Sequence, residues 1–285
     1  MTAIEALIAG LFDYAGLYPP ASLGLRSAAN NYLEYSRSAR ASALGRFIVN
    51  LDRLDELRSI VGDSLGKFRI SVILNSDVDA LDGVAEGIRN GIPIETLEIK
   101  CAHLEDIERL RPKIPGQLMS YFEVPVGSAG RAALQAVSGA GGRAKIRMGG
   151  VVPEAFPPVL ETVQMLAALA TLRLPFKATA GLHHPVRSCR DLTYQPHGPR
   201  GTMHGFMNLC CAAAVLYYGG DAGDARKLLE EEDPSAWQIG RDAIQWRHLK
   251  WSTDQLATMR HEFFESIGSC SFEEPMHDLE SLAWL

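Results

Sequence analysis

Two lysines lie inside short apolar runs and give the first indication of chemistry. Lys145 stands in the run Ala-Lys-Ile-Arg-Met-Gly-Gly at 144–150, and Lys177 stands in Phe-Lys-Ala-Thr-Ala-Gly-Leu-His-His at 176–184. A lysine among apolar neighbours and ahead of glycines is typical of a buried strand that ends in a turn where a ligand can approach the backbone. A lysine amine attacks carbonyl compounds when its neutral form is populated, which burial and a neighbouring cation favour. We therefore expect an active site at the ends of these two strands.

Strand periodicity extends this site to other parts of the chain. Side chains alternate between the two faces of a strand, so the apolar positions of each run identify the outer face and leave the polar ones inside. In a barrel, polar residues near the strand C-termini face the site. The predicted catalytic set is Lys145, Lys177, Glu123, Glu98 and Asp13. The predicted substrate-binding set on the barrel strands is Arg147, Thr179, Asn50 and Asn75. The alternative is a polar network that only fills the barrel mouth.

The two lysines have different expected roles. Arg147 lies two residues from Lys145 on the same face, so Lys145 is the better candidate for the nucleophile. Lys177 is the better candidate for an electrostatic partner, and the carboxylates can move protons beside the amine. The alternative is that both lysines are paired with Glu98 and Glu123, as structural ties or as clamps for an anionic substrate.

The elements that must position these residues alternate along the chain. Strands separated by helical patterns indicate βαβ units and a parallel sheet. We predict a single (β/α)8 TIM-barrel domain over residues 1–285, with residues 186–251 as an insertion between strands 7 and 8 that acts as a lid or an oligomer contact. Residues 186–202 are expected to form a long loop, and residues 244–251 an extra strand or a loop. The predicted barrel strands are 12–17, 46–50, 68–75, 94–100, 117–124, 145–149, 176–180 and 266–272, and the predicted helices are 2–11, 25–38, 54–61, 78–90, 104–110, 131–138, 154–172, 203–218, 222–232 and 253–264.

Three histidines follow the second lysine strand. His183 and His184 come directly after it, and His204 opens a later helix. We expect them to bind substrate or shuttle protons, with a turn-capping role as the alternative for His183. Because the chain has no HxH, HExxH or CxxC spacing, we expect no cofactor; the alternative is a divalent metal held by these three histidines with a carboxylate.

The last predicted strand ends in the run Gly-Ser-Cys-Ser-Phe-Glu-Glu-Pro at 268–275. Gly268, Ser269 and Ser271 suit an anion bound by backbone N–H groups. The alternative is a tight turn in which Glu273 and Glu274 begin the final helix. Cys270 is expected to pack inertly, since the sequence does not pair it with a histidine.

The order of these motifs resembles that of the deoxyribose-phosphate aldolases and the wider class I aldolase barrels. Residues 12–19, Phe-Asp-Tyr-Ala-Gly-Leu-Tyr-Pro, resemble that family's first strand, Ile-Asp-His-Thr-x-Leu-x-Pro. The resemblance implies that Lys145 takes the place of the Schiff-base lysine and that residues 177–181 correspond to the second lysine motif, Lys-Ala-Ser-Gly-Gly. It also implies that Glu123 is the fifth-strand glutamate, that Glu98 stands near the acidic residue of the fourth strand, and that Gly268 and Ser269 form the phosphate-binding turn.

Composition narrows the function classes. The chain has 285 residues, a formal charge of −6 and no long basic stripe, which argues against nucleic-acid binding. The start of the sequence has no basic region of a signal peptide, no apolar run is long enough to span a membrane, and the five cysteines form no disulfide framework. We expect a cytoplasmic homo-oligomer that acts as a lyase or aldolase on a small anionic carbonyl compound through a lysine Schiff base. The alternatives are a metal-dependent lyase, isomerase or hydrolase, and a non-catalytic binding protein for an anionic metabolite.

Overall fold

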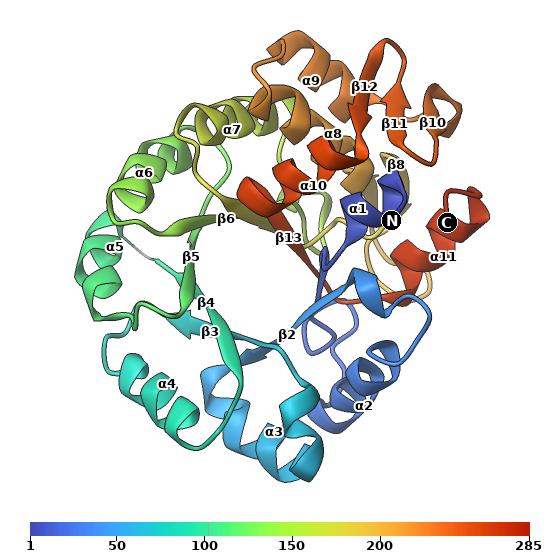
Figure 1. Ribbon diagram of the computed structural model, residues 1–285. Coiled ribbons are helices and arrows are strands. Elements are labelled where there is room, and N and C mark those ends of the chain that lie inside the picture. Colours follow the sequence, from blue (N-terminus) through green and yellow to red (C-terminus); the bar gives the residue numbers. More distant parts are fainter. Residues whose placement is uncertain (102) are drawn as a thin grey trace.

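A closed barrel of parallel strands forms the centre of the molecule (Figure 1). The computed structural model describes residues 1–101 and 103–285, and within them eight strands close the barrel in the order β1-β2-β3-β4-β5-β6-β7-β13. The prediction of a (β/α)8 barrel is confirmed at this level. The barrel strands are β1 (Phe12–Tyr14), β2 (Leu44–Asn50), β3 (Ile70–Asn75), β4 (Ile94–Lys100), β5 (Met119–Val124), β6 (Arg143–Arg147), β7 (Phe176–Thr179) and β13 (Phe264–Ser269).

A ring of helices covers the outside of these strands (Figure 1). The outward positions of the strands are apolar and buried, as at Leu97, Ile99 and Phe122, which are at most 1% exposed. Burying such side chains between strand and helix is the main favourable contribution to folding of this layer. The helices are α1 (Ala3–Ile8), α2 (Leu25–Tyr35), α3 (Leu54–Val61), α4 (Ala80–Arg89), α5 (Leu104–Leu110), α6 (Ser128–Gly139), α7 (Val159–Thr171), α8 (Phe206–Tyr217), α9 (Ala222–Glu230), α10 (Thr253–Glu262) and α11 (Glu273–Ser281).

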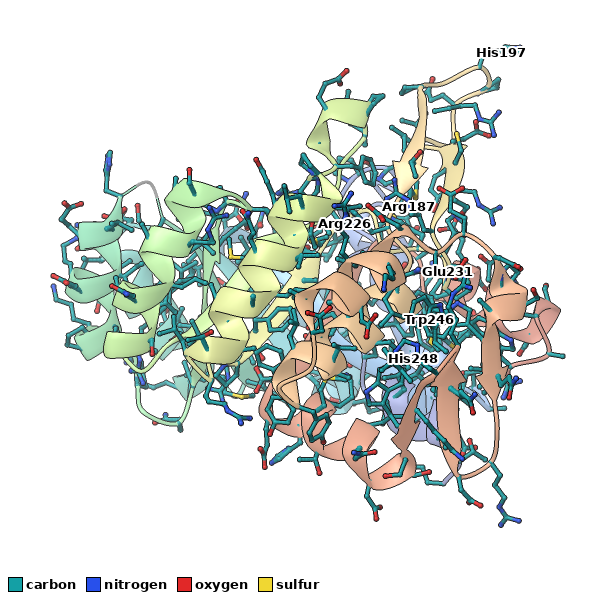
Figure 2. All side chains as sticks on the ribbon, turned by 90° about the horizontal axis from the view of Figure 1, so that it is seen from above. Arg187, His197, Arg226, Glu231, Trp246 and His248 are labelled. Carbon is teal, nitrogen blue, oxygen red and sulfur yellow. The ribbon has the colours of Figure 1, made fainter. Side chains whose placement is uncertain are left out.

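The chain between β7 and β13 contains further elements. Residues 186–202 were expected to be a loop, but Ser188–Asp191 (β8) pairs antiparallel with Arg200–Met203 (β9), so this prediction is wrong. Figure 2 shows this hairpin standing out from the barrel, with His197 at its tip. Within the same stretch, α8 packs against the barrel, where Phe206 lies edge-on to Phe12 of β1 at 5.2 Å between ring centroids.

An antiparallel sheet follows α9. It consists of β10 (Trp237–Ile239), β11 (Ala243–Trp246) and β12 (Leu249–Ser252), so residues 244–251 form strands rather than a loop. Glu231, at the end of α9, accepts hydrogen bonds from the Trp246 indole at 3.2 Å and the Arg247 guanidinium at 3.0 Å (Figure 2). These contacts fix the sheet to the helix that precedes it.

Among the described residues no helix is long and apolar enough to cross a membrane.

Two glycines after the lysine strands allow their loops to touch. Gly149 follows β6 and Gly181 follows β7, and a Cβ on either would lie 2.9 Å from the Cα of the other. A Cβ on Gly149 would also lie 2.5 Å from the Phe156 ring. Gly181 has a positive φ of 69°, which a residue with a side chain rarely adopts. The close approach holds the ends of the two lysine strands side by side.

This contact predicts a large effect of one added methyl group. Gly149→Ala should lower the free energy of unfolding by about 1–3 kcal/mol, because the Cβ meets backbone and a ring that cannot both move away. The measurement is urea unfolding followed by circular dichroism. Gly139→Ala is the matched control: its Cβ meets nothing within 4 Å, so stability should stay equal or rise by about 0.4–1 kcal/mol. Equal stability of the two variants would contradict the proposed close contact.

Candidate active site

The two lysines are direct neighbours on adjoining strands. Lys145 of β6 is in register with Lys177 of β7, and Glu123 of β5 is in register with Lys145 on its other side. All three side chains face the barrel interior, as their alternation with the outward-facing Ile146 and Ala178 requires. The structure thus brings the predicted carboxylates and amines of different strands into one cluster.

Lys177 is held by two carboxylates and is fully buried. Its Nζ donates hydrogen bonds of 2.6 Å to Oδ2 of Asp13 and 2.6 Å to Oε1 of Glu98, and all three side chains are 0% exposed. Burial alone would lower the pKa of Lys177, but the charges of Asp13 and Glu98 outweigh it and raise the pKa above its ordinary value. Lys177 is therefore a permanent ammonium group at neutral pH.

Glu98 joins the two lysines. While its Oε1 accepts from Lys177, its Oε2 lies 2.8 Å from Nζ of Lys145. The Ser71 hydroxyl donates a further 2.7 Å hydrogen bond to Oε1, and Thr96 donates to Ser71 at 2.7 Å. Burial opposes ionisation of Glu98, but the two lysine charges hold its pKa well below the ordinary value. The carboxylate is ionised and fixed in orientation.

Asp13 on β1 completes the inner part of the cluster. Besides Lys177, its carboxylate accepts hydrogen bonds of 2.7 Å from the Ser266 hydroxyl and 2.7 Å from the backbone N–H of Arg46. Burial raises the pKa of Asp13, but the charge of Lys177 and then that of Arg46 outweigh the effect and lower it. Asp13 thereby connects β1, β2, β7 and β13.

Lys145 is held differently from Lys177. Its Nζ lies 2.8 Å from Oε2 of both Glu98 and Glu123, and its side chain is 3% exposed. These two contacts are longer than the 2.6 Å contacts of Lys177. Glu123 also accepts hydrogen bonds of 3.1 and 3.2 Å from Arg147. Burial opposes ionisation of Glu123, but Lys145 and Arg147 lower its pKa.

A cavity of about 370 Å³ opens above this cluster. Lys145 belongs to the described lining of this cavity, whereas Lys177 does not. Of the two lysines, Lys145 is therefore the one that a molecule in the cavity can reach. Arg147, whose side chain is 47% exposed, lies at the cavity and pairs with Glu123. The predicted site residues that line the cavity are Glu98, Lys145, Arg147, Thr179, His183, His184 and Gly268.

Other predicted residues lie elsewhere. Asn75 is exposed and outside the cavity lining, and Asn50 contributes indirectly by accepting a 2.8 Å hydrogen bond from the cavity residue Tyr18. The Ser269 hydroxyl donates to the backbone carbonyl of Ser271, and the Ser271 hydroxyl accepts from the N–H of Glu274. In the structure these two serines shape the turn into α11, and neither belongs to the cavity lining, so their role in binding an anion stays a prediction. The side chains stabilise the turn because they satisfy backbone groups at its ends.

The three histidines have separate partners. Nδ1 of His183 lies 2.9 Å from Glu274, Nδ1 of His184 lies 2.6 Å from Asp278, and Nε2 of His204 lies 2.8 Å from the carbonyl of Pro157. His204 is outside the cavity lining, in contrast to the expectation that it binds substrate. No group of three or more potential metal ligands comes together in the residues that the structure describes.

Sequence reasoning missed several cavity residues. Tyr194, from the turn of the β8–β9 hairpin, and Lys100, at the end of β4, both line the cavity. Lys100 shares strand parity with Glu98, so alternation could have included it. Tyr194 and its neighbours belong to the segment that was expected to be a loop, and no local signal placed them over the barrel.

Comparison with known proteins adds no further constraint. Neither a scan against protein-family models nor a comparison with curated proteins finds a match for this chain. The likeness to class I aldolase barrels accordingly depends on the motifs described above and on the chemistry of the cluster.

Removing Lys177 should be strongly destabilising. Lys177→Met leaves Asp13 and Glu98 buried without their shared cation, and breaking such a pair costs about 3–5 kcal/mol. Urea unfolding measures the loss, and Lys250→Met at an exposed position is the control, with a change within about 0.5 kcal/mol. The double variant Lys177→Met with Glu98→Gln should recover part of the loss. A single variant as stable as the control would contradict the central role of this ion pair.

Stability should vary with pH in a direction set by the cited pKa shifts. The pKa values of Asp13, Glu98 and Glu123 are lowered on folding, so the stability they add is present above about pH 4.5 and is lost as the pH falls through the folded values. The pKa of His183 is raised from 6.5 to about 10, so its contribution is present below pH 6.5 and is lost as the pH rises towards 10. The pKa values of His184 and His204 are lowered by burial, so their contribution is lost as the pH falls below 6.5, and unfolding measured from pH 3 to pH 10 should show a maximum near pH 6.5. His183→Gln should flatten the alkaline side, and an unchanged slope would contradict the assignment.

Proposed function

We propose that the protein is a lyase of the aldolase type that acts on a small anionic carbonyl compound through an imine on Lys145. The observation that carries the proposal is the position of the Lys145 amine, in the cavity lining and between two ionised carboxylates, with the Lys177 ammonium behind it. The cavity has the volume of a small-molecule site. A closed parallel barrel with polar groups at the strand C-termini is consistent with enzymatic function but does not choose a reaction.

The nucleophile is Lys145 because Lys177 is unsuited to the role. Nucleophilic attack requires a neutral amine. Lys177 has a raised pKa, two short hydrogen bonds to carboxylates and no place in the cavity lining. Its role is electrostatic, because it neutralises part of the charge on Glu98, and Glu98 also pairs with Lys145.

The carboxylates beside Lys145 serve two stages of the reaction. In the first, Oε2 of Glu123, 2.8 Å away, accepts a proton from Nζ, and the neutral amine attacks the carbonyl carbon. Loss of the carbonyl oxygen as water then gives an iminium ion, which restores a positive charge at the same nitrogen. Two fixed carboxylates around Nζ stabilise that cation without reorganisation. The two carboxylates stabilise positive charge at Nζ, so they oppose formation of the neutral amine and favour the iminium ion that follows.

Carbon–carbon cleavage follows from the same arrangement. The iminium accepts the electron pair of the breaking bond and becomes an enamine, while a carboxylate takes the proton of the β-hydroxyl group and an aldehyde or ketone is released. Protonation of the enamine and addition of water then free Lys145 and the second product. Lys100 and Arg147 at the cavity suit the anionic group of the substrate. Residues 186–251, as an insertion in the barrel, would act as the lid or oligomer contact.

Reductive trapping tests this proposal directly. The protein is incubated in three separate reactions with pyruvate, glyoxylate or glycolaldehyde phosphate, and each reaction contains sodium borohydride. The product is mapped by peptide mass spectrometry. The expected adduct is on Lys145, with the mass of the carbonyl compound less one oxygen atom. Lys145→Gln should abolish it, whereas the exposed Lys250→Gln, the matched control, should leave the yield unchanged.

Three outcomes would overturn the imine mechanism. An adduct that maps to other lysines would exclude Lys145 as the nucleophile. No adduct together with stoichiometric divalent metal by elemental analysis would favour a metal-dependent enzyme. No adduct together with tight binding of one of the probes and no turnover would favour a binding protein.

A further inference from the structure

A cysteine lies in the same cavity as Lys145. Cys270 follows β13 directly and is 6% exposed, and it belongs to the cavity lining. Its Sγ lies 3.9 Å from Nε2 of His183, within the reach of a hydrogen bond to sulfur. The sequence alone indicated inert packing for Cys270, but an inert buried cysteine has apolar neighbours and no imidazole at this distance.

His183 is oriented by a carboxylate on its far side. Its Nδ1 lies 2.9 Å from Oε2 of Glu274, in the first turn of α11, so that Nε2 points at the sulfur of Cys270. Burial of the ring lowers the pKa of His183, but the contacts with Cys270 and Glu274 outweigh burial and raise it to about 10. An imidazole within reach of a cysteine sulfur can accept its proton, which produces the nucleophilic form of cysteine. Cys270 is placed as a nucleophile, His183 as its base and Glu274 as the carboxylate that orients the base. This is the arrangement of a catalytic triad, which is recognised by geometry rather than by sequence position.

The other described cysteines provide a contrast. Cys210 lies on the buried helix α8, and burial raises its pKa to about 12. Burial raises the pKa of Cys101 to about 12 as well. Cys189 is exposed on β8 of the hairpin. Cys270 differs from these three cysteines because it lies in the cavity lining and contacts an imidazole. Burial or exposure alone does not account for that contact.

We propose that Cys270, His183 and Glu274 form a second catalytic centre, which transfers the acyl group of a small anionic ester or thioester to the Cys270 sulfur. This activity goes beyond the proposed imine chemistry and does not require it. The thiolate attacks the acyl carbon, the Sγ–C bond forms, and the bond from that carbon to the leaving oxygen or sulfur breaks. His183 gives its proton to the leaving alcohol or thiol. Water then attacks the acyl-cysteine with His183 as base, and the carboxylic acid and the free thiol are released.

The cavity favours a small substrate with a negative charge. Its volume is about 370 Å³, and its lining includes the cationic side chains of Lys145 and Arg147. Tyr194 reaches over the sulfur from the β8–β9 hairpin, with its hydroxyl 3.9 Å from Sγ. The tyrosine therefore limits the space at Cys270 and excludes long acyl chains.

The test is acylation of the full-length protein by p-nitrophenyl acetate. We expect a rapid release of one nitrophenol per chain, and peptide mass spectrometry should place the acetyl group on Cys270. Cys270→Ser should abolish the burst, while Cys189→Ser, a matched removal of a cysteine from the protein surface, should retain it. His183→Gln should slow acylation of Cys270 about 100-fold or more, since it removes the general base. Circular dichroism of each variant shows that it is folded.

Mapping on the unmodified protein keeps the proposal falsifiable even where a variant fails to fold. Acetylation confined to Cys189 or to lysines would overturn it, as would equal rates at Cys270 in the unmodified protein and in folded His183→Gln. Failure here is distinguishable from failure of the imine mechanism. This assay contains no borohydride and reads a bond to sulfur, whereas reductive trapping reads a bond to the Lys145 nitrogen.

Discussion

The carboxylate of Glu98 is the constraint on which the rest of the structure depends. It is buried between two lysines and contacts each at 2.8 Å or less. A charge removed from water requires compensation in its immediate surroundings, because no solvent is there to supply it. The strands that carry Asp13, Lys177 and Lys145 must therefore keep a fixed register with β4. The close approach of Gly149 to Gly181 fits the register of β6 with β7 at the strand ends.

The cluster balances the needs of a stable core against those of a reactive amine. Three carboxylates, on Asp13, Glu98 and Glu123, face three cations, on Lys145, Lys177 and Arg147. The fully buried pair around Lys177 has short, directed hydrogen bonds. Around Lys145, the ion pairs are longer, at 2.8 Å, and lie at the edge of the cavity. In the proposed imine mechanism the amine exchanges these contacts for a bond to the substrate, which the longer ion pairs oppose less than the 2.6 Å contacts of Lys177 would.

Alternation along single strands predicted much of the cluster, because the face of a side chain is a local property of a strand. It identified Asp13, Glu98, Glu123, Lys145 and Lys177, and the βαβ pattern predicted the barrel that brings them together. Local pattern could not show the local hydrogen bonds of a side chain, such as the one from Ser269 to the carbonyl of Ser271. It also could not show pairings across long stretches of chain. The hairpin of β8 and β9 was expected to be a loop, and the contact of Cys270 with His183 joins residues 87 positions apart.

The permanent charges lie below the cavity and the two proposed nucleophiles lie at its lining, and this separation lets one cavity hold both. The permanent ions, Lys177 and Asp13, are fully buried, so their charges stay fixed while substrate enters. Lys145 of β6 and Cys270, directly after β13, both line the cavity, and each has its own neighbouring proton acceptor, Glu123 for the amine and His183 for the sulfur. In the two proposed reactions, separate acceptors allow each nucleophile to lose its proton without competing with the other for one base. Both proposed centres use the same cavity and its cationic lining, so substrate size and charge would be common requirements while the reaction at each centre would be set by its own base.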